Sequence, residues 1–487
     1  MPTAPKLKDE LDRLLARGDT AAAKEVAAEM LRRNPRDGDA WLGVAQVAIA
    51  ADRLRVAEEA LERAGRVLGE DHRVAYARAI VDHYLARSDR AIDRLRSLIA
   101  RRAPNALDAH VFLADILHRV GRRTEVQSLI DEGGPWLSDP RGRILAARAR
   151  AATDRPGAIE ALASIARAGG DPAMRRNAGF EAVALLDASG EYRRAFDLAT
   201  EVHAATRVPF DLGELQADIA RQRELLARGR AWFVPRVPHV EGIALVAGMP
   251  RSGTTLLEQM LDRHSQAAGI GEYEGIPGMA ASLLHWGAWP RGIGMLDAAQ
   301  ASELQANYLG DARTPDVAGK RWLVDKSLHT WRWLPAVAAF LPGARCLHMA
   351  RDPRDTAVSL YLSNFHPRNF AWTQSLDLIR EVMELERAHT LDALATLGIA
   401  HEAIVYEDMV DAPEAHARRV CALLGIDPEP AMLAPEANTR TVLTLSHEQV
   451  RRPINRGSIG RWRNYEWAFG PGWDRLAAIH ESRKRGG

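Results

Sequence analysis

Apolar residues recur at helical spacing through the first 210 residues. Leu7, Leu11, Leu14 and Leu15 form one stripe, and a second stripe with the same spacing covers residues 23–31. Turn residues interrupt this pattern in two interleaved series, and each series recurs about every 34 residues. The two series include Gly18-Asp19, Asp52, Ser88-Asp89, Gly121, Asp154 and Gly190, and Asn34-Pro35, Gly69, Pro104, Asp139-Pro140 and Asp171-Pro172. The period predicts an α-solenoid of helix hairpins at residues 1–210, each hairpin packing its apolar face on its neighbours.

The pattern changes after residue 241 to short apolar runs that alternate with helical stretches. Such alternation is typical of a parallel sheet flanked by helices, so we predict an α/β domain at residues 241–487. Residues 211–240 are predicted to be a linking helix and the domain boundary, because Pro235 and Pro238 end the helical pattern there. The predicted strands are Ile243–Ala247, Trp322–Val324, Cys346–Met349 and Ala403–Tyr406.

Composition and charge narrow the class of protein. The 487 residues are 47% hydrophobic and 26% charged, which is typical of packed globular domains, and the net charge of +1 gives no reason to expect a nucleic-acid partner. The only cysteines, Cys346 and Cys421, form no metal-binding pattern. No run approaches the ~18 apolar residues of a membrane helix, and the first residues lack an apolar leader, so we expect a cytoplasmic protein with no membrane span.

The segment after the first predicted strand has the chemistry of an anion site. Arg251-Ser252-Gly253-Thr254-Thr255 joins that strand to the amino end of a helix, where backbone N–H groups and the helix dipole favour a phosphate. The phosphate loop of nucleotide triphosphatases ends in Gly-Lys-Ser/Thr, but here no lysine follows Gly253. The segment therefore predicts phosphate binding without the lysine that serves β- and γ-phosphates.

Further polar residues follow the other predicted strands. Asp325-Lys326 follows the second strand, Arg351 the third and Glu407 the fourth. Because ligands of parallel α/β sheets bind at the carboxyl ends of the strands, we expect these groups and Arg251 to gather at one edge.

Taken together, these motifs resemble those of sulfotransferases that use 3′-phosphoadenosine-5′-phosphosulfate (PAPS). Residues 241 to about 470 resemble the catalytic domain, and the whole chain resembles bacterial tetratricopeptide-repeat sulfotransferases, related in motif to tyrosylprotein sulfotransferases. The matching segments are Pro250–Leu256, Arg351–Ser359, Tyr406-Glu407, and Ser446–Pro453 with Gly457 and Arg461-Trp462.

The resemblance implies a role for each matched residue. It makes Glu272 the general base, with Lys326, Arg251 and Ser446 stabilising the leaving phosphate oxygen. It also implies two phosphate sites, one for the 5′-phosphosulfate and one for the 3′-phosphate, and no metal. The residues expected to bind the cofactor are Arg251, Ser252, Gly253, Thr254, Thr255, Arg351, Ser359, Tyr406, Ser446 and Arg461.

Several alternatives stay open at this point. Glu274 or His329 can replace Glu272 as the base, and Asp325 can be interpreted as a magnesium ligand of an ATP-dependent phosphotransferase. The sulfotransferase-like domain can also be a degenerate part of an interaction protein.

The acceptor needs a hydroxyl, in a peptide tyrosine, a sugar, a lipid headgroup or a small phenol. The helical repeats offer a surface for the acceptor, a protein partner or a second copy in a homodimer, or serve only as a scaffold.

Overall fold

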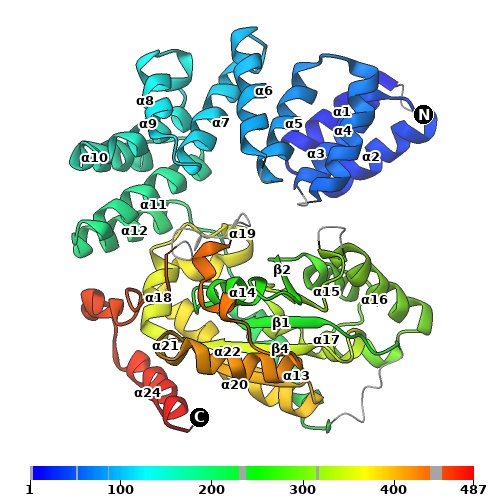
Figure 1. The fold of residues 1–487 in the computed structure, drawn as a ribbon, viewed down its shortest axis with the longest axis vertical. Helices are drawn as coiled ribbons and strands as arrows, with labels where there is room; N and C mark the ends of the chain where they lie inside the picture. The colour runs from blue at the N-terminus through cyan, green and yellow to red at the C-terminus, as the bar shows by residue number, and fades with distance from the viewer. Residues whose placement is uncertain are drawn as a thin grey trace. The chain divides into compact units, whose positions relative to one another are not determined.

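The structure is a computed structural model that describes residues 4–50, 53–85, 87–229, 237–313, 317–438 and 452–486. The contacts within the chain divide it into two compact units, Met1–Leu185 and Leu186–Gly487 (Figure 1). No helix among the described residues is long and apolar enough to cross a membrane.

The first unit consists of paired helices. Alternate helices begin at Gly38, His72, Ala106 and Pro140, which is the predicted period of about 34 residues. The α-solenoid expected from the sequence is therefore confirmed. The helices are α1 (Ala4–Ala16), α2 (Thr20–Arg33), α3 (Gly38–Ala50), α4 (Leu54–Leu68), α5 (His72–Tyr84), α6 (Ser88–Ala100), α7 (Ala106–Arg119), α8 (Arg123–Asp131), η1 (Pro135–Leu137), α9 (Pro140–Arg150), α10 (Arg155–Arg167) and α11 (Pro172–Ala188), which crosses the division.

The turn residues that mark the period also cap the helices. The side chains of Asp19, Asp71, Asp139 and Asp154 each accept a hydrogen bond from a backbone N–H in the first turn of the helix that follows. Such a cap satisfies one of the N–H groups that a helix start leaves without an intrahelical partner. The breaks in the apolar pattern are therefore the helix starts of the array.

The second unit contains a five-stranded sheet in the order β2-β3-β1-β4-β5, in which all neighbouring strands are parallel. Its strands are β1 (Ile243–Gly248), β2 (Ala267–Gly271), β3 (Trp322–Asp325), β4 (Arg345–Ala350) and β5 (His401–Val405). The central strand β1 is buried throughout: Ile243, Leu245 and Ala247 belong to the hydrophobic core on one face, and Ala244 and Val246 to the core on the other.

Helices cover both faces of this sheet (Figure 1). The core on one face includes residues of α15, α16, α17 and α20, and the core on the other includes residues of α14, α21 and α22. The helices of the unit are α12 (Tyr192–Ala205), α13 (Leu212–Leu226), α14 (Thr254–Asp262), α15 (Gly275–His285), η3 (Ile293–Met295), α16 (Ala298–Ala312), η5 (Thr330–Arg332), α17 (Leu334–Phe340), α18 (Pro353–Tyr361), α19 (Pro367–Phe370), η6 (Ala371–Gln374), α20 (Leu376–Leu397), α21 (Tyr406–Asp411), α22 (Pro413–Leu424), η7 (Pro430–Leu433), η8 (Pro435–Ala437), η9 (Arg461–Ala468) and α24 (Pro471–Gly486).

The contacts group α12 and α13 with the sheet-containing unit. The sequence pattern had assigned α12 to the repeats at residues 1–210 and α13 to the linking segment at residues 211–240. In α12, His203 Nε2 lies 2.9 Å from the carbonyl oxygen of Tyr361. In α13, the side chain of Gln222 donates to the carbonyl oxygen of Arg332 at 3.1 Å. These two helices thus use polar contacts to the α/β unit that a repeat period does not reveal.

Candidate active site

The loop between β1 and α14 has a conformation that its sequence dictates. Gly253 has a φ of 100°, and a Cβ atom there would lie 2.3 Å from the ring of Tyr406, so glycine is needed for two reasons. Arg251 has a φ of 70°, which non-glycine residues adopt rarely. The Ser252 hydroxyl donates to the carbonyl oxygen of Met249 at 2.6 Å. The loop is thus fixed in shape, and it leads into the positive end of the α14 dipole.

The two expected phosphate-binding segments are hydrogen-bonded to each other. Arg251 Nε donates to Ser359 Oγ in α18 at 2.8 Å, and Arg351 Nη1 donates to the carbonyl oxygen of Arg251 at 2.8 Å. Thr254 and Thr255 form the first turn of α14, and both are buried. The structure therefore brings the loop after β1 and the segment after β4 together at the carboxyl ends of adjacent strands.

Arg351 is held on several sides but keeps one unused donor. Its Nη2 donates to the carbonyl oxygen of Ser458, and its guanidinium lies over the Tyr406 ring with 4.9 Å between the cation and the ring centroid. Its Nε is buried and has no hydrogen-bond partner in the described part of the chain. A buried donor without a partner is costly, so this atom is suited to an acceptor from outside the chain.

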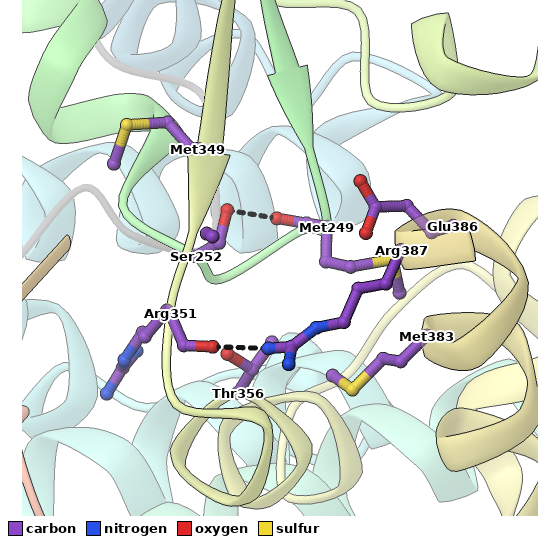
Figure 2. A pocket seen from close by; sticks show the side chains of 9 residues that line it. Met249, Ser252, Met349, Arg351, Thr356, Met383, Glu386 and Arg387 are labelled. Atoms are coloured by element: carbon purple, nitrogen blue, oxygen red, sulfur yellow. Dashed lines mark hydrogen bonds between the residues drawn. The ribbon is translucent and has the colours of Figure 1, made fainter. Parts of the chain in front are cut away.

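Helix α20 supports this region through Arg387, which Figure 2 shows extending from the helix toward Arg351. The Arg387 guanidinium donates to the carbonyl oxygen of Arg351 at 2.9 Å, and Figure 2 shows it reaching past Met383 toward that oxygen. The enclosed cavity here has a volume of about 10 Å³, enough for roughly one water molecule. Its lining residues are Met249, Ser252, Met349, Ala350, Arg351, Thr356, Met383, Glu386 and Arg387. The anion loop therefore rests on packed structure and not on a void.

A third arginine completes a cluster of positive charge. Arg461, in the C-terminal segment, donates to Asp187 Oδ2 at 2.5 Å. Desolvation, together with the nearby charges of Arg351 and Arg461, lowers the pKa of Arg251 to about 10. Three guanidinium groups close enough to affect one another repel, and a bound anion would relieve that repulsion.

The expected catalytic pair is also assembled. Lys326 Nζ donates to Glu272 Oε1 at 2.9 Å. The two side chains differ in exposure, because Lys326 is 1% exposed whereas Glu272 is 42% exposed. This places a carboxylate that solvent can reach directly beside a buried ammonium group, at the ends of the neighbouring strands β2 and β3.

The other residues considered for catalysis have less suitable surroundings. Burial and the nearby charge of Arg332 lower the pKa of His329 to about 4, and its ring stacks on Phe370 with 4.9 Å between centroids. Glu274 is exposed and immediately precedes α15. Ser446 lies outside the described residues, so its expected role stays a prediction.

Asp325 is engaged by the protein on both carboxylate oxygens. The Tyr308 hydroxyl donates to Oδ2 at 2.7 Å, and the Ser327 backbone N–H donates to Oδ1 at 2.9 Å. Burial raises the pKa of Asp325 to about 6 despite these donors. Both oxygens therefore serve hydrogen bonds within the fold, which disfavours the interpretation of Asp325 as a magnesium ligand.

The Tyr406-Glu407 pair supports the segment after β4. Tyr406 provides the ring under Arg351, and Glu407 Oε1 accepts a hydrogen bond from the Asp352 backbone N–H at 2.9 Å. Burial acts to raise the pKa of Glu407, but contacts with the His480 ring and the Asp352 N–H lower it below its ordinary value. Glu407 thus fixes the chain beside Arg351 as a carboxylate.

Two residues at the site were not predicted from the sequence. Asp355 accepts hydrogen bonds from the backbone N–H groups of Gly460 at 2.7 Å and Trp462 at 2.8 Å, and Asp187 accepts from Arg461 and Tyr465. Together they fasten the C-terminal segment to the anion site. Asp355 falls within the matched motif, but nothing in the local sequence around Asp187 indicates this contact.

Comparison with known proteins agrees with this geometry. Residues 244–430 match the sulfotransferase family, and residues 14–80 match the tetratricopeptide repeat. The chain carries a sulfotransferase domain. That domain includes the loop after β1, the Glu272–Lys326 pair and the Arg351 segment, whereas Arg461 lies beyond the matched residues.

Relatives that match part of this chain include eukaryotic and bacterial proteins. An uncharacterized protein of Aquifex aeolicus is 28% identical over 316 residues, which are 60% of this chain and 40% of that protein. Protein-tyrosine sulfotransferase 2 of Gallus gallus is 23% identical over 45% of this chain and 62% of its own length. The chain thus spans about two fifths to three fifths of these relatives. Among solved structures, the sulfotransferase domain of the Synechococcus PCC 7002 olefin synthase covers 51% of this chain and 97% of its own, with 20% identity and a TM-score of 0.38.

Proposed function

We propose that this protein is a PAPS-dependent O-sulfotransferase. The observation that carries the proposal is that an arginine-rich anion site and the Glu272–Lys326 pair both lie at the carboxyl ends of strands of one parallel sheet. A nucleotide with phosphate on both its 3′ and 5′ oxygens fits these residues for two reasons. The charges of Arg351 and Arg461 act on Arg251, and Arg351 Nε is buried without a hydrogen-bond partner among the described residues. Bound PAPS would supply the sulfuryl group.

The residues of the chain have distinct tasks in this proposal. The loop at residues 251–255 and the amino end of α14 hold the 5′-phosphate, and Arg351 with Ser359 holds the 3′-phosphate. Glu272 accepts the proton of the acceptor hydroxyl as that oxygen attacks sulfur. Lys326, buried beside it, stabilises the negative charge that develops on the departing phosphate oxygen.

A phenolic hydroxyl is the first acceptor to test. Several relatives are named protein-tyrosine sulfotransferases, and Glu272 is exposed enough to meet a side chain presented by another molecule. We therefore propose tyrosine in a peptide as the leading acceptor class, followed by small phenols.

The proposal is tested with the intact protein in two measurements. Calorimetry with 3′-phosphoadenosine-5′-phosphate (PAP) is expected to show binding, and adenosine 5′-monophosphate, which lacks the 3′-phosphate, is expected to bind more weakly. Transfer of labelled sulfate from PAPS is then measured on a panel that contains a tyrosine peptide, a small phenol, a sugar and a lipid headgroup. Absence of PAP binding would overturn the proposal.

A further inference from the structure

A closed ring of hydrogen bonds lies directly behind the Glu272–Lys326 pair. The Tyr308 hydroxyl donates to Asp325 Oδ2 at 2.7 Å, and Ser327 Oγ lies 2.5 Å from Asp325 Oδ1 and 2.7 Å from the carbonyl oxygen of Tyr273. The Tyr273 hydroxyl donates to the carbonyl oxygen of Tyr308 at 2.7 Å, which closes the ring. The ring therefore joins α16, the end of β3 and the segment after β2.

The two proposed catalytic residues are built into this ring through the main chain. Lys326 stands between Asp325 and Ser327, and Glu272 immediately precedes Tyr273. Asp325 and Ser327 flank Lys326, and Ser327 contacts the carbonyl oxygen of Tyr273, the residue after Glu272. The part of the ring centred on Asp325 therefore limits how far the ammonium and the carboxylate can separate. The Lys326 backbone N–H also donates to the carbonyl oxygen of Gly271 at 2.9 Å, which ties the two segments at a further point.

Burial makes the ring stiff. Asp325 is fully buried, and Tyr308 and Ser327 are only 2% and 3% exposed. Water cannot replace a lost donor at such a carboxylate, so each hydrogen bond restricts the geometry more than it would at the surface. Edge-to-face packing of the Tyr273 and Tyr308 rings, with 5.2 Å between their centroids, fills the space between the two segments.

We propose that Asp325 and Tyr308 are positioning residues that hold Lys326 beside Glu272 for sulfuryl transfer, an inference that rests on the function proposed above. Neither residue is proposed to touch the substrates. Their effect is expected on the turnover step and its pH dependence, while the affinity for PAP depends on the arginine cluster and is expected to stay unchanged.

The protonation state of Asp325 is expected to affect how the turnover rate depends on pH. Burial raises its pKa to about 6, and the Tyr308 hydroxyl is one of the donors that hold the pKa down. Loss of that donor is therefore expected to raise the pKa of Asp325 further and to shift the acid limb of the turnover profile to higher pH. Among the described residues, Lys326 and Tyr308 are the ionisable groups that act on the Asp325 carboxylate. Glu272 pairs with Lys326, Tyr273 acts on Tyr308, and Glu258 from α14 accepts from the Gly271 backbone N–H.

The chain offers a matched pair of variants for the test. Tyr308→Phe removes the hydroxyl that donates to the Asp325 carboxylate, whereas Tyr273→Phe removes the hydroxyl that donates to the backbone carbonyl oxygen of Tyr308. With p-nitrophenol as the acceptor, Tyr308→Phe is expected to lower kcat about tenfold and to move the acid limb upward, with a PAP dissociation constant within about twofold of wild type. Tyr273→Phe is expected to leave the limb in place.

Crystal structures of the two intact variants test the positioning whether or not sulfate is transferred. The separation of Lys326 Nζ and Glu272 Oε1, 2.9 Å in the wild type, is expected to lengthen in Tyr308→Phe and to persist in Tyr273→Phe. An unchanged separation in Tyr308→Phe, or a pH profile shared by both variants, would overturn the inference. Failure of the wild type to bind PAP would overturn the proposed function instead. The crystal structures of the two variants would still decide whether Tyr308 and Asp325 hold Lys326 beside Glu272.

Discussion

At the scale of single residues, the anion site depends on how each guanidinium is oriented. Arg351 is fixed by carbonyl oxygens and by the Tyr406 ring, and its Nε remains as a donor. Arg351→Ala is expected to raise the PAP dissociation constant about 10- to 100-fold, the usual effect of a lost charge-assisted hydrogen bond. Calorimetry measures this directly, and an unchanged dissociation constant would remove Arg351 from the 3′-phosphate site. Arg351→Lys, which keeps the charge but not the planar fork, is expected to recover only part of the affinity.

The proposed base has a neighbour that serves as its control. Glu272→Gln removes the carboxylate beside Lys326 and is expected to lower kcat by ~10²–10⁴-fold, the usual contribution of a positioned base, with PAP affinity retained. Glu274→Gln, two residues away and also exposed, is expected to keep near-wild-type turnover. Labelled-sulfate transfer by the two variants decides between them, since the opposite pattern would assign the base to Glu274.

Asp325 is expected to contribute to the pH dependence of the free energy of unfolding. Its pKa rises from 3.8 in the unfolded reference to about 6 in the fold, so the folded state favours the protonated acid. The stability contributed by this group is therefore greatest below about pH 4 and is lost as the pH rises through 6, a change of ~3 kcal/mol. Urea unfolding at pH 4.5 and pH 7 is expected to show this loss in wild type relative to Asp325→Asn. A stability difference that does not change with pH would contradict the assignment.

The sequence predicted the residues with local motifs and missed those that act across the fold. The loop at 251–255, Arg351, Ser359 and the Glu272–Lys326 pair were named from matched motifs, and their roles stay predictions. The structure joins Arg251, Ser359 and Arg351 in one group and Glu272 and Lys326 in another. Asp187 was missed because its partner Arg461 is far away in the chain, and only the folded structure connects them. The magnesium role was only an alternative interpretation of Asp325, and the contact of Asp325 with Tyr308 was not foreseen because Tyr308 lies in a helix without a recognisable motif.

At the scale of elements, four of the five strands were predicted to within about two residues. The exception is β2, Ala267–Gly271, whose sequence of alanine, glycine and isoleucine has little intrinsic strand preference. Its pairing with β3 fixes it as an edge strand, which is a tertiary effect. Residues 330–340 form two short helices, η5 and α17, and Pro335 lies in the first turn of α17, where a proline is tolerated.

The C-terminal segment is an element whose anchoring can be tested. Asp187 pairs with Arg461 and so competes with a phosphate for that guanidinium, while Asp355 independently holds the backbone at Gly460 and Trp462. Asp187→Asn is therefore expected to lower the PAP dissociation constant about two- to fivefold at low salt. A change of this size corresponds to the free energy of a partly exposed ion pair. In an Arg461→Ala background the same substitution is expected to have no effect. Weaker binding by Asp187→Asn alone would show instead that Asp187 orients Arg461 for the ligand.

At the scale of the whole molecule, the repeat period was easier to predict than the division between the units. A period of about 34 residues recurs along the chain and is visible without any tertiary contact. The assignment of α12 and α13 depends on tertiary contacts, such as that of His203 with Tyr361 and the packing of Leu226 in the core of the α/β unit, and such contacts carry no periodic signal. The residues proposed to bind the donor all lie in the unit that begins at Leu186.

Because the proposed donor-binding residues all lie in the second unit, donor binding is expected to slow hydrogen exchange mainly in that unit. A ligand that binds only the folded state stabilises it by ~2.7 kcal/mol at 100 times its dissociation constant, and the stabilisation is greatest in the cooperative unit that contains the site. Hydrogen exchange of the intact chain with saturating PAP is thus expected to slow around residues 249–255, 351–359 and 458–465. Residues 4–185 are expected to exchange at their original rates, and adenosine 5′-monophosphate at equal concentration provides the control for the 3′-phosphate. Slowed exchange in the repeats as well would show that donor binding is coupled to the helical array. The array would then take part in the catalytic cycle, and would be more than a surface for the acceptor, a protein partner or a second subunit.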